Sequence, residues 1–443
     1  MKLKGRRSLV WSNTLALVLL VALGLLLPTS ARTDPAGMAN GDVIVIFRDG
    51  TDIALRHHVL VQAGAVARRH FQVVGAAAAS LPHAGVRAFL ERHPDVVTIV
   101  PDRPVYAYAK GGGAAATTST QVVPAGVQRI GAAPANQLGV TGSGVGVAVV
   151  DTGLDFNHRD LKPLGQGCFT AYTAICQDDN SHGTHVGGII AARNNTVDVV
   201  GVAPNATLYA VKVLNSAGSG TDSTIIAGLD WIATANVSPP IRVVNMSLGR
   251  PGSLDDDPAL RSAVQLLYNK GISIVVAAGN DSSVGVSQQV PATYPEVMAV
   301  ASTTAVNGTN QCAYFSGVIK ADTASYFTTD GAFIGGIGVT ISAPGEDQEN
   351  ITRSCYATSV GILSTKLGGG TTRLSGTSMA APHVAGVVAL MWQRYGTLTP
   401  EDARGRIRGH ASRVGTAPLD SPTIGYTFDG EHEGIAWAPG ATQ

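Results

Sequence analysis

The chain has 443 residues, of which 45% are hydrophobic and only 14% are charged, and its formal net charge is zero. This length predicts two or three structural units, because single domains usually hold about 100 to 200 residues. The low charged fraction disfavours long solvated arms, acidic tails and nucleic-acid-binding patches.

The first 31 residues are typical of a secretory signal peptide. Four basic residues precede an apolar run from Leu15 to Leu27, Pro28 ends the run, and small residues follow up to Ala31. A membrane anchor is the alternative, but the run of about 13 residues is shorter than the roughly 20 needed to span a bilayer. We therefore expect 1–31 to be removed and the mature protein to be secreted, extracellular and not membrane-bound.

The sequence pattern of residues 42–109 predicts a small α+β unit. Strand and helix patterns alternate along it, at 42–47, 53–64, 71–74, 76–81, 86–93 and 96–100. Four strands and two helices in this order indicate a ferredoxin-like split βαβ sandwich. The stretch 110–120 is rich in Gly, Ala and Thr, a composition typical of a flexible linker.

Residues 121–443 alternate apolar strand patterns with helical ones. The strand patterns are short and rich in β-branched residues, at 144–150, 206–214, 241–248, 273–278, 297–302 and 339–342. Such runs fit a mainly parallel sheet buried on both faces, and helical patterns such as 223–236 and 258–270 would cover it. We expect a three-layer α/β domain, in which ligands bind beyond the carboxyl ends of the strands.

Four cysteines fit an oxidising compartment. None forms a CxxC pair, so a zinc site has little support. Four cysteines allow three pairings, of which we favour Cys168–Cys176 together with Cys312–Cys355. Buried free thiols are the alternative.

Three polar motifs contain the residue types that acyl transfer by a serine needs. Asp151 ends a strand pattern in Val-Val-Asp-Thr-Gly, His182 opens a helical pattern in Ser-His-Gly-Thr-His, and Ser378 opens another in Gly-Thr-Ser-Met-Ala. In this chemistry a hydroxyl attacks, an imidazole takes and returns the proton, and a carboxylate orients the imidazole. A helix start also presents unpaired N–H groups and the positive end of the helix dipole.

These motifs resemble the three signatures of the subtilisin family, in the same order along the chain. The resemblance extends from about residue 121 to 408. It implies a serine endopeptidase of subtilisin-like α/β fold, with a triad of Asp151, His182 and Ser378. The family would hydrolyse proteins through an acyl-enzyme, and we expect broad specificity.

Some neighbouring residues compete for the triad roles. Asp155 and Asp160 are alternative carboxylates, but the strand-end position and the family pattern both select Asp151. The family uses the first histidine of the His-Gly-Thr-His pair, so His185 is expected to be a packed helix residue. His383 is also expected to be structural.

The resemblance also implies an oxyanion site at Asn280, whose amide would act with the backbone N–H of Ser378. An asparagine capping a turn is the alternative. Substrate would bind by strand addition to two matched segments, Gly218-Ser219-Gly220 and Ser247-Leu248-Gly249. An open, largely apolar pocket for the residue before the cut bond would be lined by Ala277, Ala278 and Gly279, with Gln289 near its floor.

A structural Ca²⁺ site is implied as well, and no organic cofactor. Ligation by oxygen atoms alone suits Ca²⁺. Here the side chains would come from Gln121, Asp160 and Asn195, and the backbone carbonyls from Arg193, Val197 and Val199. A surface loop without metal is the alternative.

The unit 42–109 resembles, more weakly, the propeptide inhibitor domain of subtilisin precursors. It would assist folding and then occupy the cleft with its tail near 105–110, as an intramolecular inhibitor. If Gln121 binds calcium, maturation should cut upstream of it, and we expect the cut within 110–120. The other expected partners are protein and peptide substrates. We expect no binding of nucleic acid, and we expect the protein to be a monomer.

Three other function classes are disfavoured. A catalytically silent binding or chaperone protein would need a broken triad or oxyanion site, and none is broken. A processing protease of the kexin type would add a β-sandwich domain, for which we expect the 35 residues after Arg408 to be too few. An adhesin or structural protein would carry repeats or an anchor, and we expect neither here.

Overall fold

The computed structural model describes residues 41–111, 120–161, 164–172, 175–422 and 430–443. The predicted signal peptide at 1–31 and most of the predicted linker at 110–120 lie outside these ranges. Within them, none of the helices combines the length and the apolar content needed to cross a membrane.

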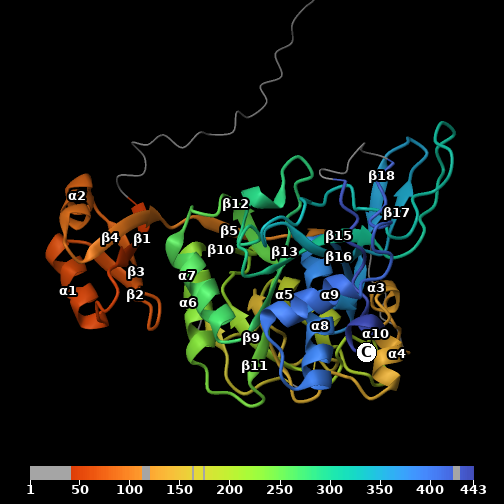
Figure 1. The fold of residues 1–443 in the computed structure, drawn as a ribbon, viewed down its shortest axis with the longest axis horizontal. Helices are drawn as coiled ribbons and strands as arrows, with labels where there is room; N and C mark the ends of the chain where they lie inside the picture. The colour runs from red at the N-terminus through yellow and green to blue at the C-terminus, as the bar shows by residue number, and fades with distance from the viewer. Residues whose placement is uncertain (1–40, 112–119, 162–163, 173–174, 423–429) are drawn as a thin grey trace, which may run out of the picture. The chain divides into compact units, whose positions relative to one another are not determined.

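The first unit is a four-stranded antiparallel sheet with two helices (red to orange in Figure 1). Its elements are β1 (Gly41–Phe47), α1 (Ile53–Ala63), β2 (Val66–His70), β3 (Ala76–Leu81), α2 (Ala84–Arg92) and β4 (Val96–Pro101). The strand order β2-β3-β1-β4 is that of the expected ferredoxin-like sandwich. Asp52 caps α1 by accepting a hydrogen bond from the Leu55 N–H at 2.8 Å.

The strand predicted at 71–74 is wrong, because β2 covers 66–70 and a turn follows it. The carboxylate of Asp230 in the large domain accepts hydrogen bonds from the backbone N–H groups of three turn residues, at 2.6, 2.8 and 3.2 Å, namely Gln72, Val73 and Val74. Because these three N–H groups donate to a carboxylate, they do not pair with a neighbouring strand. Phe71 and Val74 are buried in the apolar cluster that contains residues of α6 (Asp222–Thr234) and α7 (Pro258–Asn269) of the large domain.

The large domain is built on a seven-stranded sheet, all of whose neighbouring strands are parallel. The strand order is β16-β15-β13-β11-β7-β9-β8. The strands are β7 (Gly146–Asp151), β8 (Phe169–Thr170), β9 (Thr207–Lys212), β11 (Ile241–Met246), β13 (Ser273–Ala277), β15 (Met298–Thr304) and β16 (Val339–Glu346). Along β7, Val147 and Val149 belong to one core and Ala148 and Val150 to the other, so the sheet is buried on both faces as predicted.

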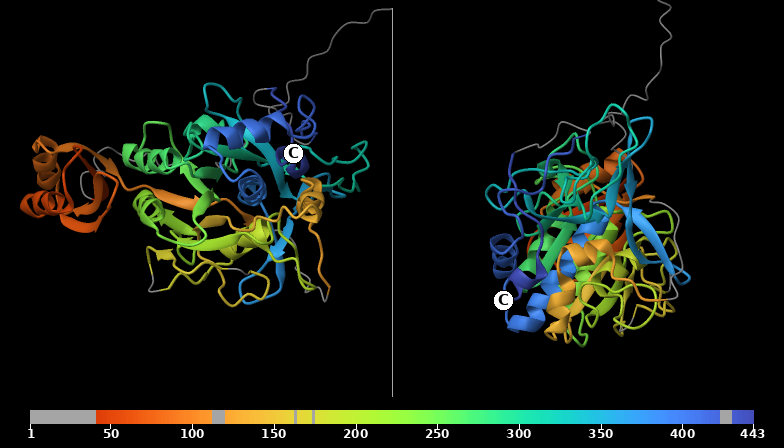
Figure 2. Two further views of the ribbon diagram at one scale, coloured as in Figure 1. Left: turned by 60° about the horizontal axis from the view of Figure 1, so that its bottom comes forward. Right: turned by 90° about the vertical axis from the view of Figure 1, so that its right-hand side faces the viewer.

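Helices cover both faces of this sheet (Figures 1 and 2). One core contains residues of α5 (His182–Ala191), α8 (Thr377–Tyr395) and α9 (Pro400–Gly409), and the other those of α6 (Asp222–Thr234) and α7 (Pro258–Asn269). Short helices complete the domain, namely α3 (Ala125–Arg129), α4 (Ala132–Gln137) and α10 (Ala438–Ala441), with a 3-10 turn at Val286–Gln288. Helix α7 begins with Pro258 after the cap residue Asp257, which accepts two backbone N–H groups.

Two small sheets join the chain between 104 and 111 to the large domain. Strand β5 (Pro104–Ala107) lies between β10 (Ser219–Thr221) and β12 (Leu248–Pro251), which also pairs with β14 (Gln289–Val290). Strand β6 (Lys110–Gly111) pairs with β20 (Thr371–Ser375), the partner of β19 (Ile362–Thr365). Residues 110–111 were predicted as linker, and they form a strand because the backbone of Leu374 and Ser375 pairs with them.

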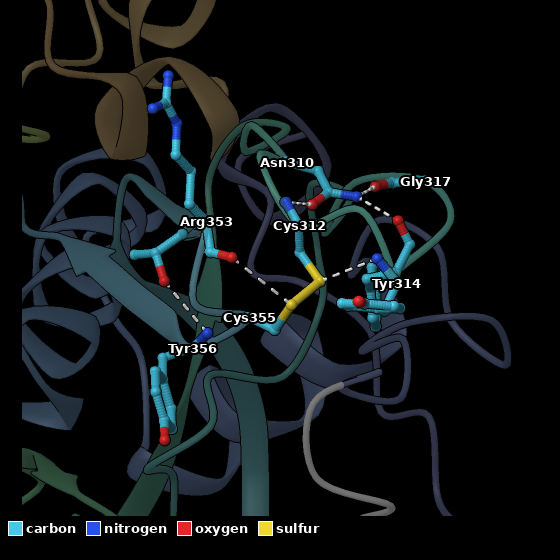
Figure 3. The surroundings of a disulfide bond; sticks show 9 residues. Asn310, Cys312, Tyr314, Gly317, Arg353, Cys355 and Tyr356 are labelled. Carbon is cyan, nitrogen blue, oxygen red and sulfur yellow. Dashed lines mark hydrogen bonds between the residues drawn. A yellow bond between two sulfur atoms is a disulfide. The ribbon is translucent and has the colours of Figure 1, made fainter.

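Both disulfides join the cysteines that the sequence favoured as pairs. Cys168 is bonded to Cys176, and Cys312 is bonded to Cys355. Figure 3 shows the second bridge, which ties the turn of the hairpin β17 (Gln348–Ile351)–β18 (Ala357–Val360) to a loop. Asn310 holds that loop, since its side chain accepts from the Cys312 N–H and donates to the Gly317 carbonyl.

Candidate active site

Asp151 and His182 meet at the carboxyl end of the large sheet. Asp151 is the last residue of β7 and His182 is the first of α5. The His182 Nδ1 atom lies 2.8 and 3.0 Å from the two carboxylate oxygens of Asp151. Asp151 is fully buried and His182 is 4% exposed, so the pair is shielded from solvent.

The charge of Asp151 controls the protonation of His182. Burial by itself lowers the pKa of the imidazole, but the carboxylate charge and its hydrogen bond outweigh burial and the pKa is raised. A raised pKa makes the ring a better proton acceptor, and the Nδ1 contact holds the tautomer whose free nitrogen is Nε2.

Ser378 is the second residue of α8 and is fully buried. Its hydroxyl donates to the Ser247 carbonyl at 2.9 Å, and the Ser247 hydroxyl donates to the Ser378 carbonyl at 2.8 Å. The His182 Nε2 atom is buried and makes no hydrogen bond to the residues that the structure describes. The structure thus joins His182 to Asp151, while the serine hydroxyl points to Ser247.

A peptide carbonyl lies between two donors beside Ser378. The carbonyl oxygen of Tyr108 accepts from the Asn280 side chain at 3.0 Å and from the Ser378 N–H at 3.4 Å. The other end of the Asn280 amide accepts from the Thr377 N–H and hydroxyl, both at 2.9 Å, which fixes its orientation. Gly376 must lack a side chain here, because a Cβ would lie 2.2 Å from that carbonyl.

The two predicted substrate-binding segments hold the chain's own residues 104–108. Strand β5 pairs antiparallel with Ser219 and Gly220 on one side and with Leu248 and Gly249 on the other. The Ala107 N–H donates to the Gly218 carbonyl at 3.0 Å, and the Tyr108 N–H to the Ser247 carbonyl at 3.4 Å. A peptide is therefore bound as an added strand, leading to the carbonyl beside Ser378.

The Tyr108 side chain is partly buried and packs against the core of the large domain. Its hydroxyl donates to the Gln289 side-chain oxygen at 2.7 Å, and burial raises the pKa of this hydroxyl. A Cβ on Gly249 would lie 2.7 Å from the ring, and one on Gly279 would lie 3.1 Å from Gln289. Gly279, predicted to line the pocket, therefore lies beside Gln289, while Ala277 and Ala278 directly before it are fully buried.

The competing residues lie in other environments. Asp155 accepts from the Asn157 and Gly368 N–H groups and from Gln177, so it braces a loop. Burial lowers the pKa of His185 to about 3 and that of His383 to about 4. Both rings bond to backbone carbonyls, so both are neutral structural residues.

The six residues predicted to bind calcium are brought together. Four oxygens lie within 3.4 Å of the Gln121 side-chain nitrogen, at 2.7, 3.2, 3.4 and 3.1 Å, from Arg193, Asn195, Val197 and Val199 respectively. All are backbone carbonyls except the Asn195 side-chain oxygen. Asp160 contacts the Asn195 side chain at 2.7 Å, and burial raises the pKa of Asp160 to about 6. A ring of neutral oxygens next to a buried carboxylate suits Ca²⁺.

Sequence reasoning did not identify Tyr108 as a site residue, and it placed Gln289 only loosely. The two lie 181 positions apart, so no local pattern connects them. The one available signal was the position of Tyr108 inside the tail expected to enter the cleft.

Comparison with known proteins agrees with this geometry. The Peptidase_S8 profile, described as the Subtilase family, matches residues 142–426. The chain is 38% identical over 367 residues to Subtilisin NAT of Bacillus subtilis subsp. natto and to Subtilisin E of Bacillus subtilis (strain 168), covering 82% of each chain. It is 39% identical over 297 residues to Subtilisin DY of Bacillus licheniformis, covering 67% of this chain and 93% of that one. The chain belongs to the subtilase family and is a subtilisin-like serine endopeptidase.

Proposed function

We propose that Ser378, His182 and Asp151 are the catalytic triad. In the first step Ser378 turns its hydroxyl from the Ser247 carbonyl toward His182 Nε2 and attacks the peptide carbonyl carbon, while the imidazole takes the hydroxyl proton. Collapse of the tetrahedral intermediate breaks the C–N bond, and the imidazole returns the proton to the leaving amine. Water then repeats the sequence on the acyl-enzyme and frees the serine.

The observation that carries this proposal is the position of the Tyr108 carbonyl. Its oxygen lies between the Asn280 amide and the Ser378 N–H, the two donors expected to stabilise a tetrahedral oxyanion. The donors are already oriented before the charge develops, because Thr377 and the start of α8 hold them.

We also propose that residues 42–108 are a propeptide that inhibits its own protease domain. Strand β5 occupies the substrate channel, and the Asp102 carboxylate accepts from the N–H and hydroxyl of Ser223, at the start of α6, at 2.8 and 2.6 Å. The bond held beside Ser378 is Tyr108–Ala109. We therefore propose maturation at this bond, upstream of the range 110–120 predicted from sequence.

The same contacts revise the proposed selectivity. An apolar pocket was expected, but the Gln289 oxygen accepts from the Tyr108 hydroxyl at its floor. We propose a broad-specificity enzyme that favours tyrosine, and then large apolar residues, before the cut bond.

We propose that Gln121, Asp160, Asn195 and the carbonyls of the loop hold a structural Ca²⁺, whose charge would offset that of the buried Asp160. An increase of the melting temperature on calcium addition, lost on chelation, would support this site. A melting temperature that ignores both would count against it.

We propose that the enzyme is secreted as a monomer and acts on extracellular proteins. The signal-like residues 1–31 support export, and the two disulfides fit an oxidising compartment.

Casein hydrolysis tests the mechanism. The folded, processed enzyme should cleave casein, a serine-directed inhibitor should abolish cleavage, and Ser378→Ala should be inactive. Thr377→Ser, which keeps the neighbouring hydroxyl, is the matched control and should retain activity. Activity of Ser378→Ala equal to wild type would overturn the mechanism.

A further inference from the structure

Segments on both sides of the proposed cleavage bond are docked at the same time in the uncut chain. On the upstream side, the Tyr108 carbonyl lies in the oxyanion site. On the downstream side, the Gln121 N–H donates to the Thr196 carbonyl at 3.0 Å and the Val122 N–H to the Asp198 carbonyl at 2.9 Å. Residues 121 and 122 are thus hydrogen-bonded to the predicted calcium loop while the chain is still uncut.

The downstream docking is a packed structure in its own right. Val122 forms a parallel bridge with Val199, and its carbonyl accepts from the Val200 N–H at 3.2 Å. Its side chain packs against a small apolar cluster formed by Ala192, Val199 and Leu363. Gln121 is therefore held at the loop by backbone pairing and apolar contact as well as by its side chain.

Residues 109–120 connect the two docked segments. Tyr108 and Gln121 are 13 residues apart, and an extended chain of that length spans at most about 45 Å. If the cut bond lay directly before Gln121, the residues next to that bond would have to lie in the substrate cleft and at the calcium loop at the same time. Cleavage would then have to come before docking.

The Gln121 amide also has the right reach for a cation. Its nitrogen now donates to the oxygens of the loop, and a half-turn of the amide group would direct its own oxygen to the same point. The Gln121 oxygen and the loop oxygens would then all face one cation, in place of the amide nitrogen that the loop oxygens now face.

We infer that the calcium loop is complete in the uncut precursor, so that calcium binding and cleavage of Tyr108–Ala109 are independent events. This inference rests on the calcium site proposed above. Calcium stabilises the precursor before any active enzyme exists. The cut then leaves residues 109–120 as an N-terminal extension that precedes the ring.

Calorimetry on the full chain carrying Ser378→Ala tests this, because that chain stays uncut. We expect it to bind one Ca²⁺ with a Kd within about threefold of that of the processed wild-type enzyme. Its Tm should rise by about 3 °C at 100-fold excess over Kd. Adding Gln121→Ala should lower the Tm in chelator, because the contacts of the amide nitrogen with the loop oxygens are lost, and it should also abolish the further rise of Tm on calcium addition. Gln128→Ala removes a nearby exposed side chain whose one described hydrogen bond goes to the Val123 carbonyl, and it should leave the response intact.

Two results would overturn the inference, and they differ. If the processed enzyme binds calcium while intact Ser378→Ala binds it 30-fold more weakly or not at all, cleavage gates the site and the calcium site itself stands. If neither form binds calcium, the site proposed above is wrong and the inference fails with it.

Discussion

The carbonyl oxygen of Tyr108 lies 3.0 Å from the side-chain nitrogen of Asn280. The same tyrosine is fixed at its other end, where its hydroxyl donates to Gln289 at 2.7 Å. One residue therefore connects the proposed oxyanion site with the floor of the proposed specificity pocket. The two contacts can be tested separately, because the one with Asn280 concerns the rate of chemistry and the one with Gln289 concerns the choice of substrate.

Asn280→Ala removes one oxyanion donor and should lower kcat by about 10²–10³-fold with little change in KM, a magnitude measured in subtilisin itself. Thr377→Val removes one of the two groups that orient the amide, so its loss of kcat should be smaller. Steady-state kinetics on a chromogenic peptide measure both. A rise in KM at constant kcat would instead assign Asn280 to substrate binding.

Gln289→Leu should lower kcat/KM for peptides with tyrosine before the cut bond by roughly tenfold, the worth of one hydrogen bond. Peptides with phenylalanine at that position should be cleaved as well as before or better, because no buried acceptor is left unpaired. The ratio of kcat/KM for a matched pair of peptides is the measurement. An unchanged ratio would contradict the role given to Gln289.

Asp151→Asn should move the pH dependence of activity. His182 must be neutral to accept the serine proton, and its pKa is raised above the usual 6.5, so activity rises with pH through that higher value. Loss of the carboxylate charge lowers the pKa, which shifts the midpoint to lower pH, and the wrong tautomer lowers kcat by about 10⁴-fold.

The matched control is Asp155→Asn, because Asp155 is the rival carboxylate near Asp151. It should leave the midpoint where it is. Profiles of kcat/KM from pH 5 to 9 distinguish the two, and a midpoint that moves only in Asp155→Asn would reverse the assignment.

The disulfides should differ in their contributions to stability. They close sequence separations of 8 and 43 residues, for which loop entropy gives about 2.5 and about 4 kcal/mol. Replacing Cys312 and Cys355 by serine should therefore lower the Tm more than replacing Cys168 and Cys176. Thiol titration of the denatured, unreduced protein should find no free thiol, and four would rule out both bridges.

Much of the large domain follows from local sequence. Valine-rich runs such as 144–150 predict buried parallel strands because they are short, continuously apolar and rich in β-branched residues. The residues proposed for catalysis and calcium binding lie in short motifs, so the sequence could name them before the structure placed them together.

The remaining features depend on partners that are remote in the chain. The turn at 71–74 is set by the Asp230 carboxylate, and the strand at 110–111 by Leu374 and Ser375. The contact between Tyr108 and Gln289 likewise exists only after folding. Local sequence propensity does not reveal such contacts. For this reason the sequence predicted a strand at 71–74 and a linker at 110–111.

Mass analysis of the products of folding tests the central claim most directly. Wild-type chain folded from denaturant should be cut first between Tyr108 and Ala109, and the chain carrying Ser378→Ala should stay whole under the same conditions. Cleavage of Ser378→Ala at this bond without added protease, or a first wild-type cut within 112–119 that leaves Tyr108–Ala109 intact, would contradict the account.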